Sequence, residues 1–378
     1  MSWSLLRWFI SYATLTVPQA AGPVAFSLAA LSLTGDTSGG AAMIFAMTLA
    51  QVLGAIPITR LGRKLPSTWV LRTLVGFRTV AFALMSVCVA TGADFLWLIL
   101  LAAIAGSVNG AAYGYLRALL NGFTPPDRLP RALGIAATLN EVTFVASPVF
   151  ASGLGSISPV WGILALSILG GLPALLAPRS DVVMTDSASL GGGSVLSPAM
   201  FLWLICAAAD GAAIAAIEIG AVALALNFGY PPALAILLTV PLCLASVAGG
   251  VWISIQNRMA SRRAVLTQLA IMTAGSALAA LNLSLVITVV GAVLMGLVLA
   301  PLGTYFSLVL DTLAPPDRRP EVFALLRTAS SLGVIFASAM LTVTSLSLAL
   351  IVITFVMAAV TVVVAVATAG QAGHEPAA

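Results

Sequence analysis

Long apolar segments, separated by short polar breaks, run through the chain from end to end. A helix needs roughly 20 mostly apolar residues to cross a bilayer, so we interpret each segment as a membrane-spanning helix. Glycine, proline and isolated charges separate twelve such segments, six in each half of the chain. The predicted spans are residues 9–33, 40–58, 70–91, 96–121, 131–153 and 157–177, then 198–226, 232–256, 263–281, 284–312, 321–343 and 346–369.

One longer polar segment, from Pro178 to Leu196, falls at the middle of the chain and contains three consecutive glycines. Its position predicts two six-helix bundles joined by a linker. The expected domains are an N-terminal bundle over 1–177, a linker over 178–197, a C-terminal bundle over 198–369 and a tail over 370–378.

A short motif supports this division because it occurs twice. The sequence from Pro125 to Pro130 recurs with one substitution from Pro315 to Pro320, 190 residues later in a chain of 378 residues. At the same offset Tyr115 matches Tyr305. Each half has an even number of spans, so both halves have the same orientation and are related by an axis along the membrane normal.

Composition agrees with a membrane protein. Apolar residues make up 61% of the chain and charged residues only 7%, against roughly 25% charged residues in a soluble domain. The net charge of +4 would suit an acidic partner, but its distribution argues for membrane topology instead of nucleic-acid binding. The three cysteines lie inside apolar segments, so no disulfide framework is expected.

Basic residues mark one side of the membrane. Cytoplasmic loops carry an excess of Lys and Arg, and with the N-terminus inside, all loop arginines and lysines fall on the cytoplasmic side. These residues are Arg7, Arg60, Arg63, Lys64, Arg128, Arg131, Arg179, Arg258, Arg262, Arg263, Arg318 and Arg319. The pattern predicts an all-α, twelve-span protein with both termini in the cytoplasm.

Three segments resemble the major facilitator superfamily. Asn121–Gly134 and Asp311–Leu325 are similar to the cytoplasmic turns after spans 4 and 10 of that family, and Thr59–Lys64 resembles its signature loop between spans 2 and 3. The resemblance implies a secondary transporter in which two bundles rock around a central site lined by spans 1, 4, 7 and 10. Within the loop it singles out Arg60, Gly62, Arg63 and Lys64. Thr59 replaces the family's aspartate, so we expect the usual charge lock to be weak or absent.

Asp210 is the first candidate for chemistry, because a charge at membrane depth costs about 2.5–3.5 kcal/mol. It lies near the middle of span 7, and its small neighbours Ala207–Ala209 and Gly211 are expected to leave space around it. Gln19 has a comparable depth in span 1, beside prolines that favour local unwinding. We predict a proton-coupling carboxylate at Asp210 and a cavity-lining amide at Gln19; a purely structural carboxylate is the alternative.

Two further carboxylates are coupling candidates. Glu218 lies eight residues beyond Asp210 and would either extend a proton route or border an outer vestibule. Glu141 lies within span 5 beside Asn140, which is a substrate-cavity candidate. Ser331 occupies the equivalent place in the second half, so the shared architecture does not require Glu141. A substrate or coupling role and a buried interhelical pair both remain open for it.

A cytoplasmic gate is predicted at the ends of spans 4 and 10. Arg117 and Asn121 are four residues apart and share a helix face. The hypothesis is that Arg117 pairs with Asp311 across the bundles when the protein is closed toward the inside. The competing interpretation pairs Asp311 with Arg327 or Arg318.

Span 4 carries two more cavity candidates and a stripe of glycines. Asn109 and Tyr115 are expected to reach the cavity and touch substrate; because Tyr305 repeats Tyr115, a structural or gate-lining role is the alternative for these two tyrosines. Gly106, Gly110 and Gly114 have the spacing that lets helices approach closely. Arg78 in span 3 is expected at the periphery, with its charge reaching toward the headgroups.

Several function classes lack their motifs. No phosphate-binding loop is present, so ATP is not expected to drive the protein. No hydrolase or metal motif appears, so we expect neither an enzyme nor a cofactor or metal. The predicted function is proton-coupled efflux of a small amphiphilic molecule by a monomer in a bacterial inner membrane. Uptake of a small metabolite, and a non-transporting sensor or scaffold, are the alternatives.

Overall fold

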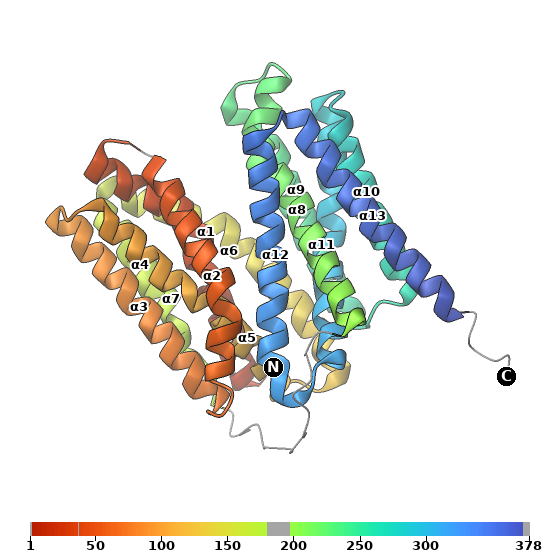
Figure 1. Ribbon diagram of the computed structural model, residues 1–378, viewed down its shortest axis with the longest axis horizontal. Helices are drawn as coiled ribbons and strands as arrows, with labels where there is room; N and C mark the ends of the chain where they lie inside the picture. The colour runs from red at the N-terminus through yellow and green to blue at the C-terminus, as the bar shows by residue number, and fades with distance from the viewer. Residues whose placement is uncertain (1, 37, 180–196, 373–378) are drawn as a thin grey trace. The chain divides into compact units, whose positions relative to one another are not determined.

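The structure, a computed structural model, describes residues 2–36, 38–179 and 197–372, and this part of the chain is helical with no strand (Figure 1). The α-helices are α1 (Trp3–Thr34), α2 (Ser38–Leu61), α3 (Ser67–Thr91), α4 (Phe95–Ser107), α5 (Asn109–Leu120), α6 (Leu129–Ile157), α7 (Pro159–Leu176), α8 (Pro198–Asn227), α9 (Ile236–Gln256), α10 (Arg262–Leu281), α11 (Leu285–Leu313), α12 (Arg319–Val343) and α13 (Leu346–Ala372). Three short 3-10 helices are η1 (Pro126–Arg128), η2 (Pro232–Ala235) and η3 (Pro316–Arg318).

The predicted spans are confirmed in number. Among the described residues, twelve helical segments are long and apolar enough to cross a membrane, with α4 and α5 together forming one of them. Large apolar side chains such as Phe45, Leu53 and Phe355 are exposed, as expected where lipid replaces water. The predicted cytoplasmic placement of the termini stays a prediction.

Local signals explain where helices begin and end. The hydroxyls of Ser2, Ser197 and Ser261 each accept the backbone N–H three residues later, which caps α1, α8 and α10. Gly35 and Gly92 follow α1 and α3 with φ values of 75° and 67°, a left-handed conformation that glycine adopts without steric cost.

Two details of the spans differ from expectation. Unwinding near Pro18 was predicted and is wrong, because α1 is continuous from Trp3 to Thr34. Pro18 packs on Gly170, and Arg78 donates to the Leu15 carbonyl one turn earlier, so neighbouring helices support the backbone there. Conversely, span 4 was predicted as one helix, yet it is interrupted at Val108, between α4 and α5.

The described chain divides into two compact units. The first unit holds residues up to Pro126, the segment from Leu139 through α7, and Ala314–Thr328 at the start of α12. The second unit holds Asp127–Thr138 at the start of α6, the helices from α8 to Leu313, and the chain from Ala329 onward. The predicted linker and tail lie mostly outside the described residues, and the predicted bundle boundaries stay a prediction.

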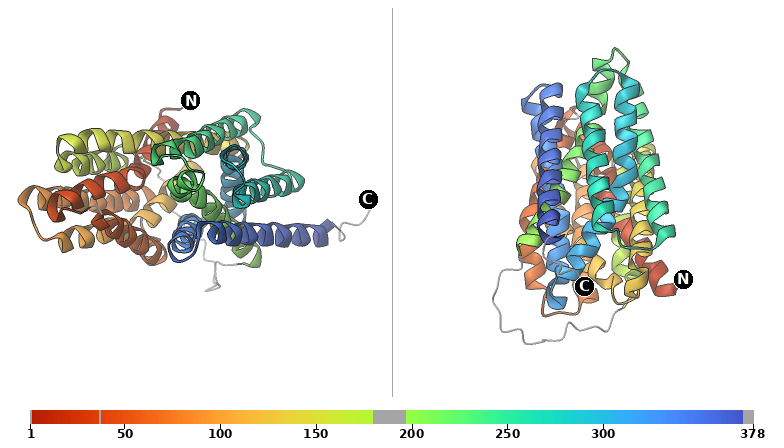
Figure 2. Two further views of the ribbon diagram at one scale, coloured as in Figure 1. Left: turned by 90° about the horizontal axis from the view of Figure 1, so that it is seen from above. Right: turned by 90° about the vertical axis from the view of Figure 1, so that its right-hand side faces the viewer.

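Within each unit the helices lie alongside one another (Figure 2). In the first unit α1 packs on α7 and α2, and α3 packs on α7 and α4, around a core that includes Phe26, Met43 and Phe82. In the second unit α11 packs on α9 and α10, and α13 packs on α10 and α8.

The glycine stripe of span 4 packs against neighbouring backbone, as predicted. A Cβ on Gly106 would collide with the Met47 carbonyl of α2, and a Cβ on Gly114 would collide with the Pro320 carbonyl of α12. Small residues therefore allow these helices to approach one another closely.

Candidate functional site

A group of five polar side chains lies inside the first unit, and we call it the polar cluster. Its members come from five helices: Gln19 of α1, Gln51 of α2, Arg78 of α3, Asn109 of α5 and Arg327 of α12. The Asn109 amide donates to the Gln51 side-chain oxygen at 2.6 Å and to that of Gln19 at 3.5 Å. Arg327 also donates to the Gln19 oxygen. The cluster thus brings together three residues predicted for the site, Gln19, Asn109 and Arg327.

Arg78 is the buried anchor of the polar cluster. Only 2% of its surface is exposed. Its guanidinium donates to the Leu15 carbonyl at 3.0 Å, to the Asn109 side chain at 2.7 Å and to the Gly170 carbonyl at 2.6 Å. The expectation that Arg78 reaches toward the headgroups is therefore wrong. Oxygen acceptors on α1, α5 and α7 surround the charge, so the interior of the unit stabilises it.

Arg327 is half-buried and uses its charge differently. Its guanidinium carbon lies 5.5 Å from the centroid of the Tyr113 ring, within reach of a cation–π interaction. Among the described residues, neither Arg327 nor Arg78 has a carboxylate within 4.0 Å. The polar cluster therefore contains two cations whose neighbours are neutral.

Tyr115 and Gly62 pack together at the end of α2. The Tyr115 hydroxyl donates to the Thr59 carbonyl at 2.8 Å, and a Cβ on Gly62 would lie 2.6 Å from that hydroxyl oxygen. Tyr115 is almost fully buried. Its hydroxyl is thus bonded to backbone, an arrangement that favours the structural alternative for Tyr115.

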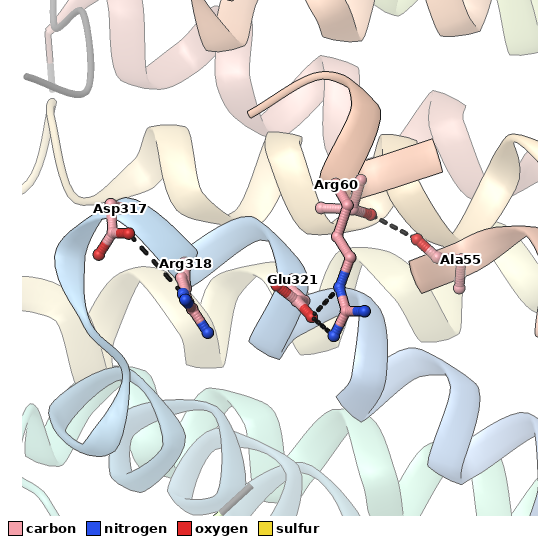
Figure 3. Close-up of polar contacts among 6 residues, drawn as sticks. Ala55, Arg60, Asp317, Arg318 and Glu321 are labelled. Atoms are coloured by element: carbon pink, nitrogen blue, oxygen red, sulfur yellow. Dashed lines mark hydrogen bonds and ion pairs between the residues drawn. The ribbon is translucent and has the colours of Figure 1, made fainter. Parts of the chain in front are cut away.

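The end of α2, where the signature loop begins, makes an ion pair with another helix, and the expectation that the family's usual charge lock is weak or absent stays a prediction. Arg60 at the end of α2 contacts Glu321 at the start of α12, with N–O distances of 2.8 Å (Figure 3). Arg60 is 62% exposed, whereas the Glu321 side chain is only 5% exposed. The carboxylate comes from α12 instead of from the loop itself, which is why Thr59 did not reveal it. Arg63 lines the small space beside Glu321, and Lys64 is exposed.

At the end of span 4, the predicted pair Arg117 and Asn121 is present. The Arg117 guanidinium donates to the Asn121 side chain at 2.9 Å and lies 4.3 Å from the Phe323 ring centroid. Asp311 is buried in α11 and belongs to the second unit. Its predicted pairing with Arg117, or alternatively with Arg327 or Arg318, therefore stays a prediction.

Asp210 lies in α8 of the second unit and is 6% exposed. Its Oδ1 atom is buried and has no hydrogen-bond partner among the described residues. The expected space around it is largely filled, because Gly211 lies against the Ser330 backbone and Gly333 against the Ala208 backbone. The small residues thus let α8 and α12 pack closely beside this carboxylate.

The other predicted carboxylates have different surroundings. Glu218 is exposed near the far end of α8, while Glu141 and Asn140 are half-buried in α6. Among the described residues, no group of three or more His, Cys, Asp or Glu side chains is arranged to hold a metal ion.

Sequence reasoning missed Gln51, Tyr113 and Glu321. Gln51 is 1% exposed within an otherwise apolar span, and a buried amide of that kind was a usable signal. Glu321 directly follows the second copy of the repeated motif, where Arg131 follows the first. That change of sign was visible in the sequence, although the pairing of Glu321 with Arg60 was not.

Comparison with known proteins agrees with this fold. The family model of the Major Facilitator Superfamily matches residues 8–338. The comparison with curated proteins finds no significant match.

Solved structures of several transporters are similar along nearly the whole chain. A bacterial homologue of the iron transporter ferroportin, in an outward-facing state, has 14% identity and a TM-score of 0.77, covering 96% of this chain and 97% of that one. The superfamily transporter FucP in the outward conformation has 14% identity and a TM-score of 0.70, covering 96% and 97%. The human organic anion transporter MFSD10 (TETRAN) has 13% identity and a TM-score of 0.69, covering 94% and 98%. At these identities the likeness shows the fold.

Proposed function

The chain belongs to the major facilitator superfamily and is therefore a multi-pass membrane protein of a secondary-transporter family, and we propose that it exports a small amphiphilic molecule in exchange for protons. Alternating access between two bundles is the mechanism that we propose. The proposed setting is a monomer in a bacterial inner membrane.

The buried carboxylate of Asp210 is the observation that supports proton coupling. Its Oδ1 atom has no hydrogen-bond partner among the described residues, in a helix that crosses the membrane. A charge in apolar surroundings is costly without a partner, so binding a proton relieves that cost. A carboxylate that is charged when water reaches it and neutral when it is enclosed links proton movement to the conformational cycle. Glu141 and Glu218 remain second candidates for this role.

The polar cluster supports a substrate-recognition role for Gln19, Asn109 and Arg327, with Asn140 as a further candidate. The two arginines of the cluster have amides, carbonyls and an aromatic ring as neighbours. Arg78 is held by three acceptors, whereas half-buried Arg327 keeps donors for another partner. A cation of this kind favours a substrate that combines an apolar body with an anionic group.

Gating is proposed for the residues at the predicted cytoplasmic ends of the spans. Arg117, Asn121 and Asp311 form the proposed gate, and the ion pair between Arg60 and Glu321 fixes the start of α12 against α2. A transporter needs contacts that are strong enough to hold one state and weak enough to open. Solvent reaches this ion pair on the Arg60 side, which keeps its contribution small, at about 1 kcal/mol.

The direct test is substrate-dependent proton movement in vesicles that contain the purified protein. A panel of apolar anions with neutral and cationic analogues is added while a dye reports the internal pH. We expect proton movement with at least one anionic member and none in protein-free vesicles. The Arg327→Gln variant should respond less to that substrate, whereas Arg128→Gln, on an exposed turn, should match wild type. A protein that moves neither protons nor substrate with any member would fit a sensor or scaffold instead.

A further inference from the structure

The second unit contains a cavity of about 220 Å³ that the proposed transport function does not use. It lies between α8, α10, α11 and α13, and most of its wall is aliphatic, including Val265, Val309 and Leu313. Three side chains differ from this wall: Trp203, Arg262 and Tyr305. The lining therefore has a long apolar surface, one cation and no acidic residue.

The polar atoms of these three side chains are available to a ligand. The Trp203 and Tyr305 rings meet edge to face with their centroids 5.0 Å apart. Among the described residues, neither the Trp203 indole N–H nor the Tyr305 hydroxyl makes a hydrogen bond. Arg262 is exposed at the first turn of α10 and has no carboxylate within 4.0 Å among the described residues.

In the first unit, a tryptophan and a tyrosine have their polar atoms bonded to backbone carbonyls. There the Trp8 indole donates to the Leu116 carbonyl at 2.6 Å, and the Tyr115 hydroxyl donates to the Thr59 carbonyl at 2.8 Å. Tyr115 and Tyr305 occupy the same position of the repeat. Trp8 and Tyr115 are thus each bonded to backbone, whereas, in the part of the chain that the structure describes, the Trp203 and Tyr305 donors are free beside the cavity. The two donors border the cavity and are not sealed inside the protein, so a ligand that enters can accept a hydrogen bond from each.

We propose that this cavity binds a membrane phospholipid with an anionic headgroup. Arg262 contacts the phosphate, the Trp203 and Tyr305 donors contact headgroup oxygens, and one acyl chain lies along Val265, Val309 and Leu313. Charge complementarity selects this occupant, because the lining has a cation and no acid. Aromatic side chains with a polar tip are also the residues that suit the membrane interface. A detergent or an apolar substrate would use the aliphatic wall and leave the three polar groups unpaired.

The test uses the full-length protein in nanodiscs, with lipid binding followed by native mass spectrometry and by thermal unfolding. Phosphatidylglycerol should bind and raise the melting temperature more than phosphatidylcholine does. Arg262→Gln should weaken the binding of phosphatidylglycerol roughly tenfold, as expected for the loss of one charged hydrogen-bond donor. Arg263→Gln is the matched control, because Arg263 is the next residue, is exposed and does not line the cavity.

A second variant and a soluble ligand separate the possible outcomes. Val309→Phe fills the cavity without changing charge, and it should reduce retention of the lipid while the protein stays folded. Glycerol phosphate, which has the headgroup charge and no acyl chain, should give no protection. Equal binding of both lipids, an equal loss in Arg263→Gln, or full protection by glycerol phosphate would overturn the proposal. None of these readouts depends on transport, so the proposal and the proposed function fail separately.

Discussion

The two copies of the Pro-Pro-Asp-Arg turn have the same local structure but are held by different chemistry. Each copy forms a short 3-10 helix, η1 or η3, that leads directly into a long helix. In the first unit the residue after the turn, Glu321, pairs with Arg60. In the second unit the equivalent residue is Arg131, and its backbone N–H donates to the Asn257 side chain at 3.0 Å. Asn257 also donates to the Asp127 carbonyl at 2.8 Å.

The difference separates the residues that set the conformation of the turn from the contacts that hold the turn in place. The prolines restrict the backbone of the turn, and they recur in both copies. The side chain of Glu321 supplies the charge pair at one turn, whereas the neutral amide of Asn257 holds the other turn through its backbone. A charge pair weakens with salt, whereas an amide bonded to backbone does not. The two turns should therefore respond differently to the same conditions.

The interiors of the two units also carry different residues at equivalent positions of the repeat. Arg78 in the first unit corresponds to Gln268 in the second, and Gly114 corresponds to Thr304. The first unit thus contains a buried cation and a close helix approach that the second unit lacks at those positions. Substitutions at these positions test whether the residues that differ between the two halves contribute to the stability of the first unit.

The largest expected effect comes from Arg78→Met. The substitution removes the three hydrogen bonds that the charged guanidinium donates to Leu15, Asn109 and Gly170, each worth about 1.5–3 kcal/mol. The melting temperature of the purified protein should fall strongly, and Arg78→Lys should recover part of the loss. The matched control is Gln268→Met, which should melt near wild type. Equal melting of Arg78→Met and Gln268→Met would contradict a structural role for the buried cation.

A smaller loss is expected for Gly114→Ala. The new Cβ would collide with the Pro320 carbonyl, and overpacking of this kind costs about 1–3 kcal/mol. The control is Gly76→Ala in α3, where a Cβ would meet no atom within 4 Å. That change should stabilise the helix slightly, by up to about 1 kcal/mol, because alanine is the better helix former. Thermal unfolding of both variants measures the difference, and a destabilised Gly76→Ala would count against this packing argument.

The smallest effect distinguishes the two turns themselves. Glu321→Gln should cost about 1 kcal/mol or less at low ionic strength, and the loss should shrink as salt is added. Asn257→Gly, which keeps the left-handed backbone of this residue (φ 49°), should cost about 1 kcal/mol at every salt concentration. Unfolding of both variants over a salt series is the measurement. Parallel salt dependence in the two variants would show that the charge pair is not what holds the start of α12.

Composition and the lengths of the apolar segments predicted the spans well. A segment that crosses lipid must be helical to satisfy its backbone hydrogen bonds, and it must carry apolar side chains along about 20 residues. The candidate site was harder to predict. Arg78 was misjudged because its acceptors, on α1, α5 and α7, come from distant parts of the sequence. The pairing of Arg60 with Glu321 was missed for the same reason. The unwinding at Pro18 was wrongly expected for a similar reason, since the support comes from other helices. Gln19, Asn109 and Arg327 were nominated separately, and the sequence alone did not reveal that they form one cluster.

The most direct test of the account compares gradient-driven accumulation with substrate exchange in vesicles that contain Asp210→Asn. If Asp210 carries the coupled proton, the variant should lose accumulation driven by a pH gradient and keep exchange of labelled for unlabelled substrate. Asp127→Asn removes a carboxylate from an exposed turn, and it should behave as wild type in both assays. Accumulation in Asp210→Asn with undiminished dependence on the pH gradient would contradict the proposed coupling.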